Sequence, residues 1–139
     1  MLRWVLDTSV IVSGLRSNRG ASFVLLEAIA LGTLRPLITT ALLLEYEDVL
    51  KRASQAAVHG FAEAEIDAYL RQLATRCDPV EISFRWRPQL QDADDELVLE
   101  AAINGRATAI VTHNVRDFGP AAAFGIAIIR PSEALLEVS

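Results

Sequence analysis

The sequence of 139 residues is poor in the side chains that bind soft metals, with one cysteine and two histidines. Cys77 alone cannot form a disulfide within the chain. Together with His59 and His113 it supplies too few ligands for a zinc site of the Cys and His kind. A metal bound by this chain would therefore be a hard cation held by oxygen atoms.

Long apolar runs are also absent. The longest ones, such as residues 23–26 and 41–44, are far shorter than the roughly 18 residues that a membrane-spanning helix needs. In addition, Asp7 places a carboxylate where a secretory signal would have its apolar stretch. We therefore expect a cytoplasmic protein that does not cross a membrane.

Basic residues are few and almost all of them are arginine, because Lys51 is the one lysine beside 12 arginines. The formal net charge is -5 and the isoelectric point is about 5.0. Proteins bind nucleic acids non-specifically mainly through basic side chains that contact the phosphates. The acidic net charge therefore argues against broad, non-specific binding of nucleic acid. A local groove lined by arginine stays possible.

Several motifs of phosphate chemistry are missing as well. The sequence has no Walker-type glycine-rich loop, no G-x-G-x-x-G and no nucleophile elbow. Two positions after Asp7, where aspartate-nucleophile phosphatases carry a second aspartate, the chain has Ser9. A phospho-accepting receiver domain would have an acidic pocket and a similar fold. Its late-strand lysine is missing, however, since Lys51 lies in a predicted helix.

The chain has 52% hydrophobic and 22% charged residues, a composition typical of folded proteins. Its length fits a single domain over residues 1–139. Strands are predicted at residues 4–6, 35–39, 79–84, 107–112 and 125–131. Helices are predicted at residues 20–31, 39–53, 62–76, 94–104 and 131–138. Between them we expect a loop at 54–61, a polar connector at 85–91 and a turn with a short helix after residue 112.

This alternation is typical of the α/β class, with a mainly parallel sheet covered by helices on both faces. Right-handed crossovers place the carboxyl ends of parallel strands at one edge of the sheet, where ligands bind in such folds. Asp7 follows the first predicted strand, and Asp117 lies in the loop after the fourth. Both are therefore candidates for a site at that edge.

Residues 92–96, DADDE, place four acidic side chains within five positions. The next residues are apolar, and Asp95 shares the core-facing stripe of the helix that they form. The other members of this stripe are Val98, Leu99 and Ala102. The opposite face, which we expect in solvent, carries Glu96, Glu100 and Asn104.

Each acid also has a simpler interpretation. Asp92 could cap a helix with Asp95 at its third position, and Asn114 has the same spacing from Asp117. Asp7 could cap a turn, and Glu45, about 60° from the centre of its apolar stripe, could be a charge at the border of the core.

Taken together, however, four carboxylates from separate segments are predicted at one sheet edge or beside the core. Their burial without a counter-charge would cost several kcal/mol per ion. A Mg²⁺ or Mn²⁺ ion would remove that cost, because both prefer carboxylate oxygens and bind phosphates. The pattern therefore predicts metal-assisted hydrolysis of phosphodiesters. Three arginines in the adjoining loops could hold flanking phosphates, although surface charge in solvent is the simpler interpretation of each. They are Arg16, Arg19 and Arg116.

These motifs resemble those of the PIN-domain nucleases, in particular the single-domain bacterial branch related to VapC-type toxins. The resemblance is carried by VLDTSVIVSG (5–14), Glu45 in LLLEYEDVL, DADDELVLEAAINGRATAIVT (92–112) and THNVRDF (112–118), which cover most of the chain in order and spacing. It implies a three-layer α/β/α sandwich with a mainly parallel five-stranded sheet. It also implies an endoribonuclease that depends on Mg²⁺ or Mn²⁺.

Carried over by motif position, the resemblance implies an acidic quartet of Asp7, Glu45, Asp95 and Asp117. Asp7, Asp95 and Asp117 would bind the metal. The supporting residues would be Thr8, Ser9, Asp92, Thr112 and Asn114. Two positions depart from the family pattern, since Ser9 stands where relatives often have asparagine and Ala93 where they often have proline.

The resemblance further implies an RNA substrate, a role as the toxin of a toxin–antitoxin pair, a small protein antitoxin as partner and a homodimer. The alternative is a catalytically silent PIN-like module that binds RNA or protein.

Overall fold

The structure is a computed structural model that describes residues 2–83, 90 and 92–138. Its strands are β1 (Trp4–Leu6), β2 (Leu37–Ile38), β3 (Asp78–Pro79), β4 (Ala109–Val111) and β5 (Ala127–Ile129). Every pairing between them is parallel. Each of the five predicted strands has a counterpart: β1 has the predicted bounds, β2, β4 and β5 are shorter than predicted, and β3 overlaps the predicted strand only at Pro79. Hydrogen bonds divide them into a three-stranded sheet in the order β1-β4-β5 and a β2-β3 pair, and β2 contacts β1.

The carboxyl ends of the three central strands lie level with one another. Leu6 of β1 pairs with Val111 of β4, which in turn pairs with Ile129 of β5. The next residues continue this register, because the Asp7 amide donates to the Val111 carbonyl at 2.9 Å and the Thr112 amide to the Ile129 carbonyl at 2.9 Å. Asp7 and Thr112 therefore lie at one edge of the sheet.

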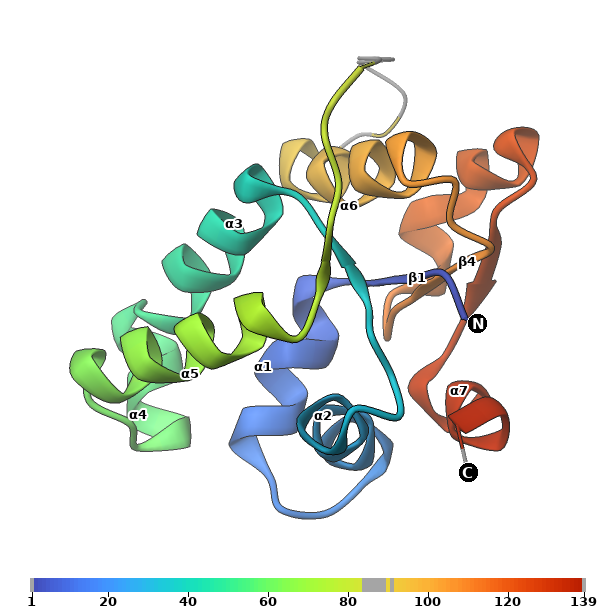
Figure 1. The fold of residues 1–139 in the computed structure, drawn as a ribbon. Coiled ribbons are helices and arrows are strands. Elements are labelled where there is room, and N and C mark those ends of the chain that lie inside the picture. The colour runs from blue at the N-terminus through green and yellow to red at the C-terminus, as the bar shows by residue number, and fades with distance from the viewer. Residues whose placement is uncertain (1, 84–89, 91, 139) are drawn as a thin grey trace.

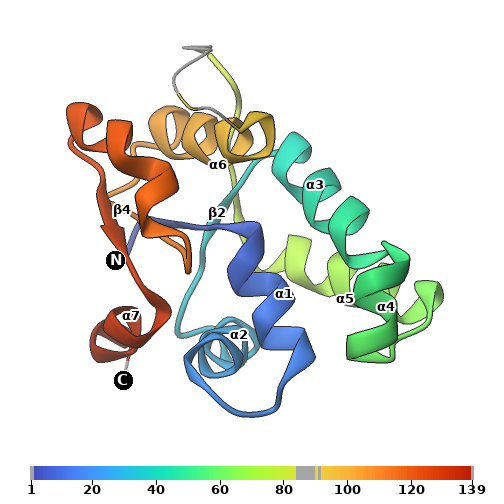
Figure 2. The ribbon, with the colours of Figure 1, turned by 180° about the vertical axis from the view of Figure 1, so that it is seen from behind.

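Helices cover both faces of the strands. They are α1 (Thr8–Arg16), α2 (Ala21–Leu31), α3 (Thr40–Leu50), α4 (Ala53–His59), α5 (Glu63–Thr75), α6 (Ala93–Asn104), the 3₁₀ helix η1 (Val115–Phe124) and α7 (Pro131–Val138). In Figure 1, α6 lies above the strands, and α1, α2 and α7 lie below them, while α3, α4 and α5 extend to one side. The reverse view in Figure 2 shows the same arrangement. The fold is thus the expected three-layer α/β/α type.

The core lies between the central strands and the helices on either face. From the strands it contains Val5 and Ile110, which are fully buried, and from α6 it contains Val98 and Leu99. Each such side chain contributes roughly 1.5–3 kcal/mol by leaving water. Gly14 lets α1 approach α2 closely, because a Cβ atom there would collide with the Leu26 side chain.

Two helices were not predicted. The segment after Asp7 was expected to be a turn, yet α1 starts at Thr8 and buries Val10 and Ile11. Residues 54–61 were expected to be a loop, but residues 53–59 form α4, which has no buried residue. The helix predicted at residues 39–53 begins as α3 with a side-chain cap, since the Thr39 hydroxyl accepts from the Leu42 amide at 3.0 Å. Phe84 and most of the predicted connector at 85–91 lie outside the described residues.

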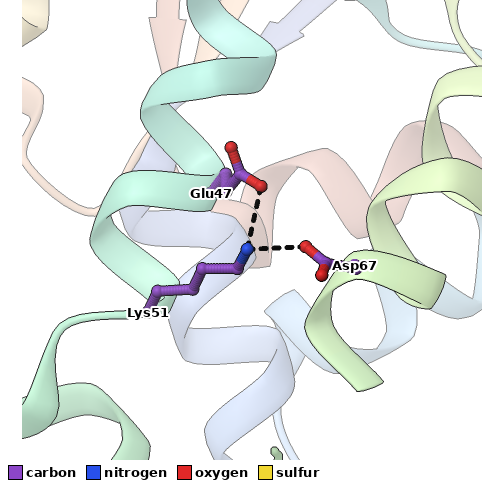
Figure 3. Close-up of polar contacts among 3 residues, drawn as sticks. All are labelled: Glu47, Lys51 and Asp67. Carbon is purple, nitrogen blue, oxygen red and sulfur yellow. Dashed lines mark hydrogen bonds and ion pairs between the residues drawn. The ribbon is translucent and has the colours of Figure 1, made fainter. Parts of the chain in front are cut away.

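The outer helices α3 and α5 are joined by an ion-pair cluster (Figure 3). Lys51 Nζ lies 3.0 Å from Glu47 Oε2 on the same helix and 2.6 Å from Asp67 Oδ1 on α5. All three side chains are partly exposed, so solvent and salt screen both ion pairs and each stabilises the fold only weakly.

None of the described helices has the length and apolar character that crossing a membrane requires.

Candidate active site

Asp7 is the first residue after β1 and occupies the N-cap position of α1. Its side chain is buried, with 4% of the residue exposed. Oδ2 accepts hydrogen bonds from the Ser9 hydroxyl at 2.7 Å and from the Thr112 hydroxyl at 2.7 Å. One donor comes from α1 and the other from the residue after β4, so two separate elements fix the orientation of this carboxylate.

The loop after β4 is held against Asp7 by the same two hydroxyls. Ser9 Oγ accepts from the His113 amide at 3.2 Å, and Thr112 Oγ1 accepts from the Asn114 amide at 2.9 Å. The His113 ring makes a further hydrogen bond of 2.8 Å with the Ser22 hydroxyl on α2. His113 therefore lies in the turn that the sequence predicts after residue 112, and its ring connects this turn to α2 by a hydrogen bond.

Asp95 lies in the first turn of α6 and is half-buried. The pKa of this carboxyl is raised to about 7, mainly by burial and then by the charges of four surrounding carboxylates. These belong, in order of decreasing effect, to Asp7, Asp92, Asp117 and Asp94. Asp95 therefore lies near acids from the end of β1, from the start of α6 and from η1.

Asp92 caps α6, as one of the simpler interpretations expected, because its Oδ1 accepts from the Asp94 amide at 2.7 Å. The corresponding interpretation for Asn114 is not supported, since its side chain forms no capping bond to η1. Asp117 lies in η1 and is exposed. Its amide donates to the Asn114 carbonyl at 3.0 Å, and the negative charge of its carboxylate is one of those that raise the pKa of Asp95.

Glu45 lies on α3, and with 8% exposure it is more deeply buried than the border position that the sequence predicts. The pKa of Glu45 is raised to about 7, mainly by burial and next by the negative charge of Asp94. Its Oε1 atom is buried and has no hydrogen-bond partner among the described residues. Glu45 is thus linked to the acidic group through Asp94, which the sequence did not single out. The position of Asp94 beside Asp95 was the available signal.

The face assignment on α6 is wrong for two residues. Glu96 and Glu100 were expected in solvent, but they are 5% and 6% exposed. The reason is that α6 contacts α3, η1 and three strands, so it is covered on more than one side. Asn104 stays half-buried, and its Oδ1 accepts from the Ser83 amide at 2.7 Å.

The predicted phosphate-binding arginines are all exposed. Arg16 ends α1, Arg19 lies in the loop before α2, and Arg116 lies in η1. Thr8 is the half-buried first residue of α1. Arg52 is not among the predicted phosphate-binding arginines, yet its positive charge acts on Glu45 and lowers the pKa of that carboxyl.

The donors of this site fit a hard divalent cation, because they are carboxylates and hydroxyls. Two observations show that the site favours positive charge: the unpartnered buried oxygen of Glu45 and the raised pKa of Asp95. In the described part of the chain, however, no three Asp, Glu, His or Cys side chains stand close enough together to hold an ion. The residue types of the site fit a divalent cation, but the described side chains do not form a complete set of ligands.

A family model described as PIN domain matches residues 3–116. The match covers most of the chain, includes Asp7, Glu45 and Asp95, and ends one residue before Asp117. The chain therefore belongs to the PIN-domain family. Its members are generally nucleases, which supports a hydrolase that acts on nucleic acids. A comparison with curated proteins gave no match.

Proposed function

We propose that this protein is an endoribonuclease that hydrolyses phosphodiester bonds of RNA and requires Mg²⁺ or Mn²⁺. One observation carries the proposal: Asp7, buried and oriented by Ser9 and Thr112, lies close enough to Asp95 to raise its pKa. Carboxylates that are held near one another against their repulsion are typical of a site that binds a cation. Family membership supports the same conclusion.

In this proposal Asp7, Asp95 and Asp117 bind the cation, and Glu45 supports them from α3. A bound divalent cation supplies polarisation of the scissile phosphate and makes the attacking water more acidic. Asp7 is already oriented in the folded chain, so it loses little side-chain freedom on binding. Asp95 and Glu45, whose pKa values are about 7, would give up protons when they bind a cation at lower pH.

The experiment is an RNA-cleavage assay with the purified chain. We expect cleavage of single-stranded or structured RNA with Mn²⁺ and none with a chelator. Asp7→Asn and Asp95→Asn should each abolish it, while Asp67→Asn, an acid-to-amide change in the α3–α5 ion-pair cluster, should not. Cleavage that persists unchanged in both site variants would identify a contaminant and overturn the assignment. A DNA strand of the same sequence tests the preference for RNA.

The second candidate is a PIN-like module that binds RNA or a protein without cutting it. It is favoured by the absence of a three-ligand cluster among the described side chains. The same assay separates the two functions, because a silent module would retain RNA in a binding experiment with no cleavage in any metal.

We also propose that the enzyme is the toxin of a toxin–antitoxin pair, with a small protein antitoxin, a homodimeric state and a cytoplasmic location. The support is the motif resemblance to single-domain bacterial PIN toxins. Expression of the chain alone should arrest growth, and the product of the neighbouring reading frame should relieve the arrest. Normal growth on expression of an active nuclease would contradict the toxin role and leave the nuclease assignment standing.

A further inference from the structure

Three charged residues form a stripe along α3 and its end. Glu45, Asp48 and Arg52 are spaced at i, i+3 and i+7, so at 100° per residue they lie within about 60° of one another around the helix. Arg52 directly follows the end of α3 and is the N-cap of α4. Its Nη2 donates to Asp48 Oδ2 at 2.9 Å. This bond turns the guanidinium back along α3, towards Glu45.

The charges around Arg52 agree with that geometry. The hydrogen bond to Asp48 raises the pKa of Arg52, and the negative charges of Glu45 and Asp94 add to the effect. The side chain is 53% exposed. Arg52 therefore presents a positive charge to solvent beside the α3 end of the acidic site.

RNA meets an electrostatic obstacle at this site. Its phosphates must approach Asp7, Asp95 and their neighbours on a chain whose formal net charge is -5. A cation at the rim offsets this repulsion for phosphates beside the one that is cut. Arginine suits the task, because its planar fork of five N–H donors matches the oxygens of a phosphate. Asp48 holds that fork beside the site before the substrate arrives.

We propose that Arg52 binds a backbone phosphate of the RNA substrate adjacent to the scissile one. This inference rests on the proposed ribonuclease function and adds a substrate contact to it. The competing explanation is that Arg52 only forms an exposed i,i+4 pair with Asp48, which would stabilise the fold slightly and contribute nothing to substrate binding.

The test compares Arg52→Gln with Arg35→Gln in steady-state cleavage of a single-stranded RNA with Mn²⁺ at several salt concentrations. Arg35 is a matched control, since it also forms an exposed ion pair with a single aspartate, Asp78, but precedes β2. For Arg52→Gln we expect KM to rise about threefold to tenfold with kcat within about twofold. The slope of log(kcat/KM) against log[salt] should become shallower by about 0.7, the loss of one phosphate contact on a single strand.

Arg52→Lys should recover the salt slope and part of KM, because it retains the charge without the fork. Arg35→Gln should match the wild type. If Arg52→Gln has the same KM and salt slope as Arg35→Gln, the inference is overturned while the nuclease assignment stands. A fall in kcat together with the melting temperature would assign Arg52 a purely structural role and also overturn it. Failure of the wild type to cleave or bind RNA would remove the proposed function and this inference with it.

Discussion

The Tyr46 hydroxyl donates a hydrogen bond to the main-chain carbonyl of Leu6. Tyr46 lies on α3 and is 2% exposed, and Leu6 is the last residue of β1. Each is the chain neighbour of an acid in the candidate site, because Glu45 precedes Tyr46 and Asp7 follows Leu6. One buried bond therefore sets the position of α3 relative to the end of β1, and with it the position of Glu45 relative to Asp7.

Tyr46→Phe should damage both folding and catalysis. The change removes only the hydroxyl, so the buried Leu6 carbonyl loses this hydrogen-bond donor. The free energy of unfolding should fall by about 1–3 kcal/mol. Under conditions where the variant is folded, kcat should fall because the two acids are less well aligned. Urea denaturation and steady-state cleavage measure these effects. Tyr69→Phe, on α5, is the control, and equal behaviour of the two variants would contradict the positioning role.

The two hydroxyls on Asp7 predict a second effect. Thr112→Val keeps the shape of the side chain but removes one donor, and Ser9→Ala removes the other. Residues that orient metal ligands typically contribute 10-fold to 100-fold to activity or metal affinity, so we expect about that loss in each variant. Thr108→Val is the matched control, because the Thr108 hydroxyl bonds the Arg3 carbonyl just before β4 begins. Activity at the control's level would show that Asp7 needs neither donor.

The strands and most helices could be predicted because local pattern and tertiary environment agree. The run at residues 109–111 is apolar, includes the β-branched Ile110 and Val111, and forms a buried strand. Helix α1 could not be predicted in the same way. Its residues Val10, Ile11 and Val12 have modest helix propensity, and their burial in the core outweighs it. Helix α4 could not be predicted for a different reason. It has no buried residue, so the sequence carries no apolar stripe that would indicate a helix there.

The candidate site was predictable at the positions that follow strands and less so on helices. Asp7 and Thr112 follow neighbouring parallel strands, and topology alone brings them to one edge. The helical wheel of α6 placed Asp95 correctly beside the core but misplaced Glu100, because it assumes one buried face. The proximity of Arg52 to Asp94 could not be predicted, since it depends on how close α3 lies to α6.

The raised pKa values predict a pH dependence of folding stability without metal. The pKa of Asp95 is about 7 against an ordinary 3.8, and that of Glu45 is about 7 against 4.5. Between about pH 4 and 7 the folded chain therefore holds more protons than the unfolded chain at these groups, so their contribution to stability falls as pH rises and levels off above about 7. Urea unfolding with a chelator at pH 4.5, 6 and 8 measures this trend.

The matched comparison for this trend is Asp95→Asn against Asp67→Asn. Asp95→Asn should flatten the decline, because it removes one of the two groups with a raised pKa. Asp67→Asn should not, since the hydrogen bond from Lys51 lowers the pKa of Asp67 and its effect lies at more acidic pH. The same decline in both variants would show that Asp95 does not cause it.

A divalent metal should reverse the cost of this repulsion. A ligand that binds only the folded state stabilises it by RT ln(1 + [L]/Kd), which is about 2.7 kcal/mol at 100 times Kd and corresponds to a rise in melting temperature of roughly 10 °C for a chain of this size. At pH 8, Asp95→Asn should change the melting temperature in opposite directions without metal and with metal. Without metal it should melt above the wild type, because an unfavourable charge is gone.

With Mg²⁺ or Mn²⁺ the order should invert, since the variant has lost a ligand and gains little from the ion. Asp67→Asn should show the full metal response of the wild type, because Asp67 belongs to the α3–α5 ion-pair cluster (Figure 3). Thermal unfolding followed by circular dichroism, with chelator and with millimolar metal, gives all six melting temperatures. A wild type that melts at the same temperature in both conditions would show that these carboxylates repel one another without forming a cation site.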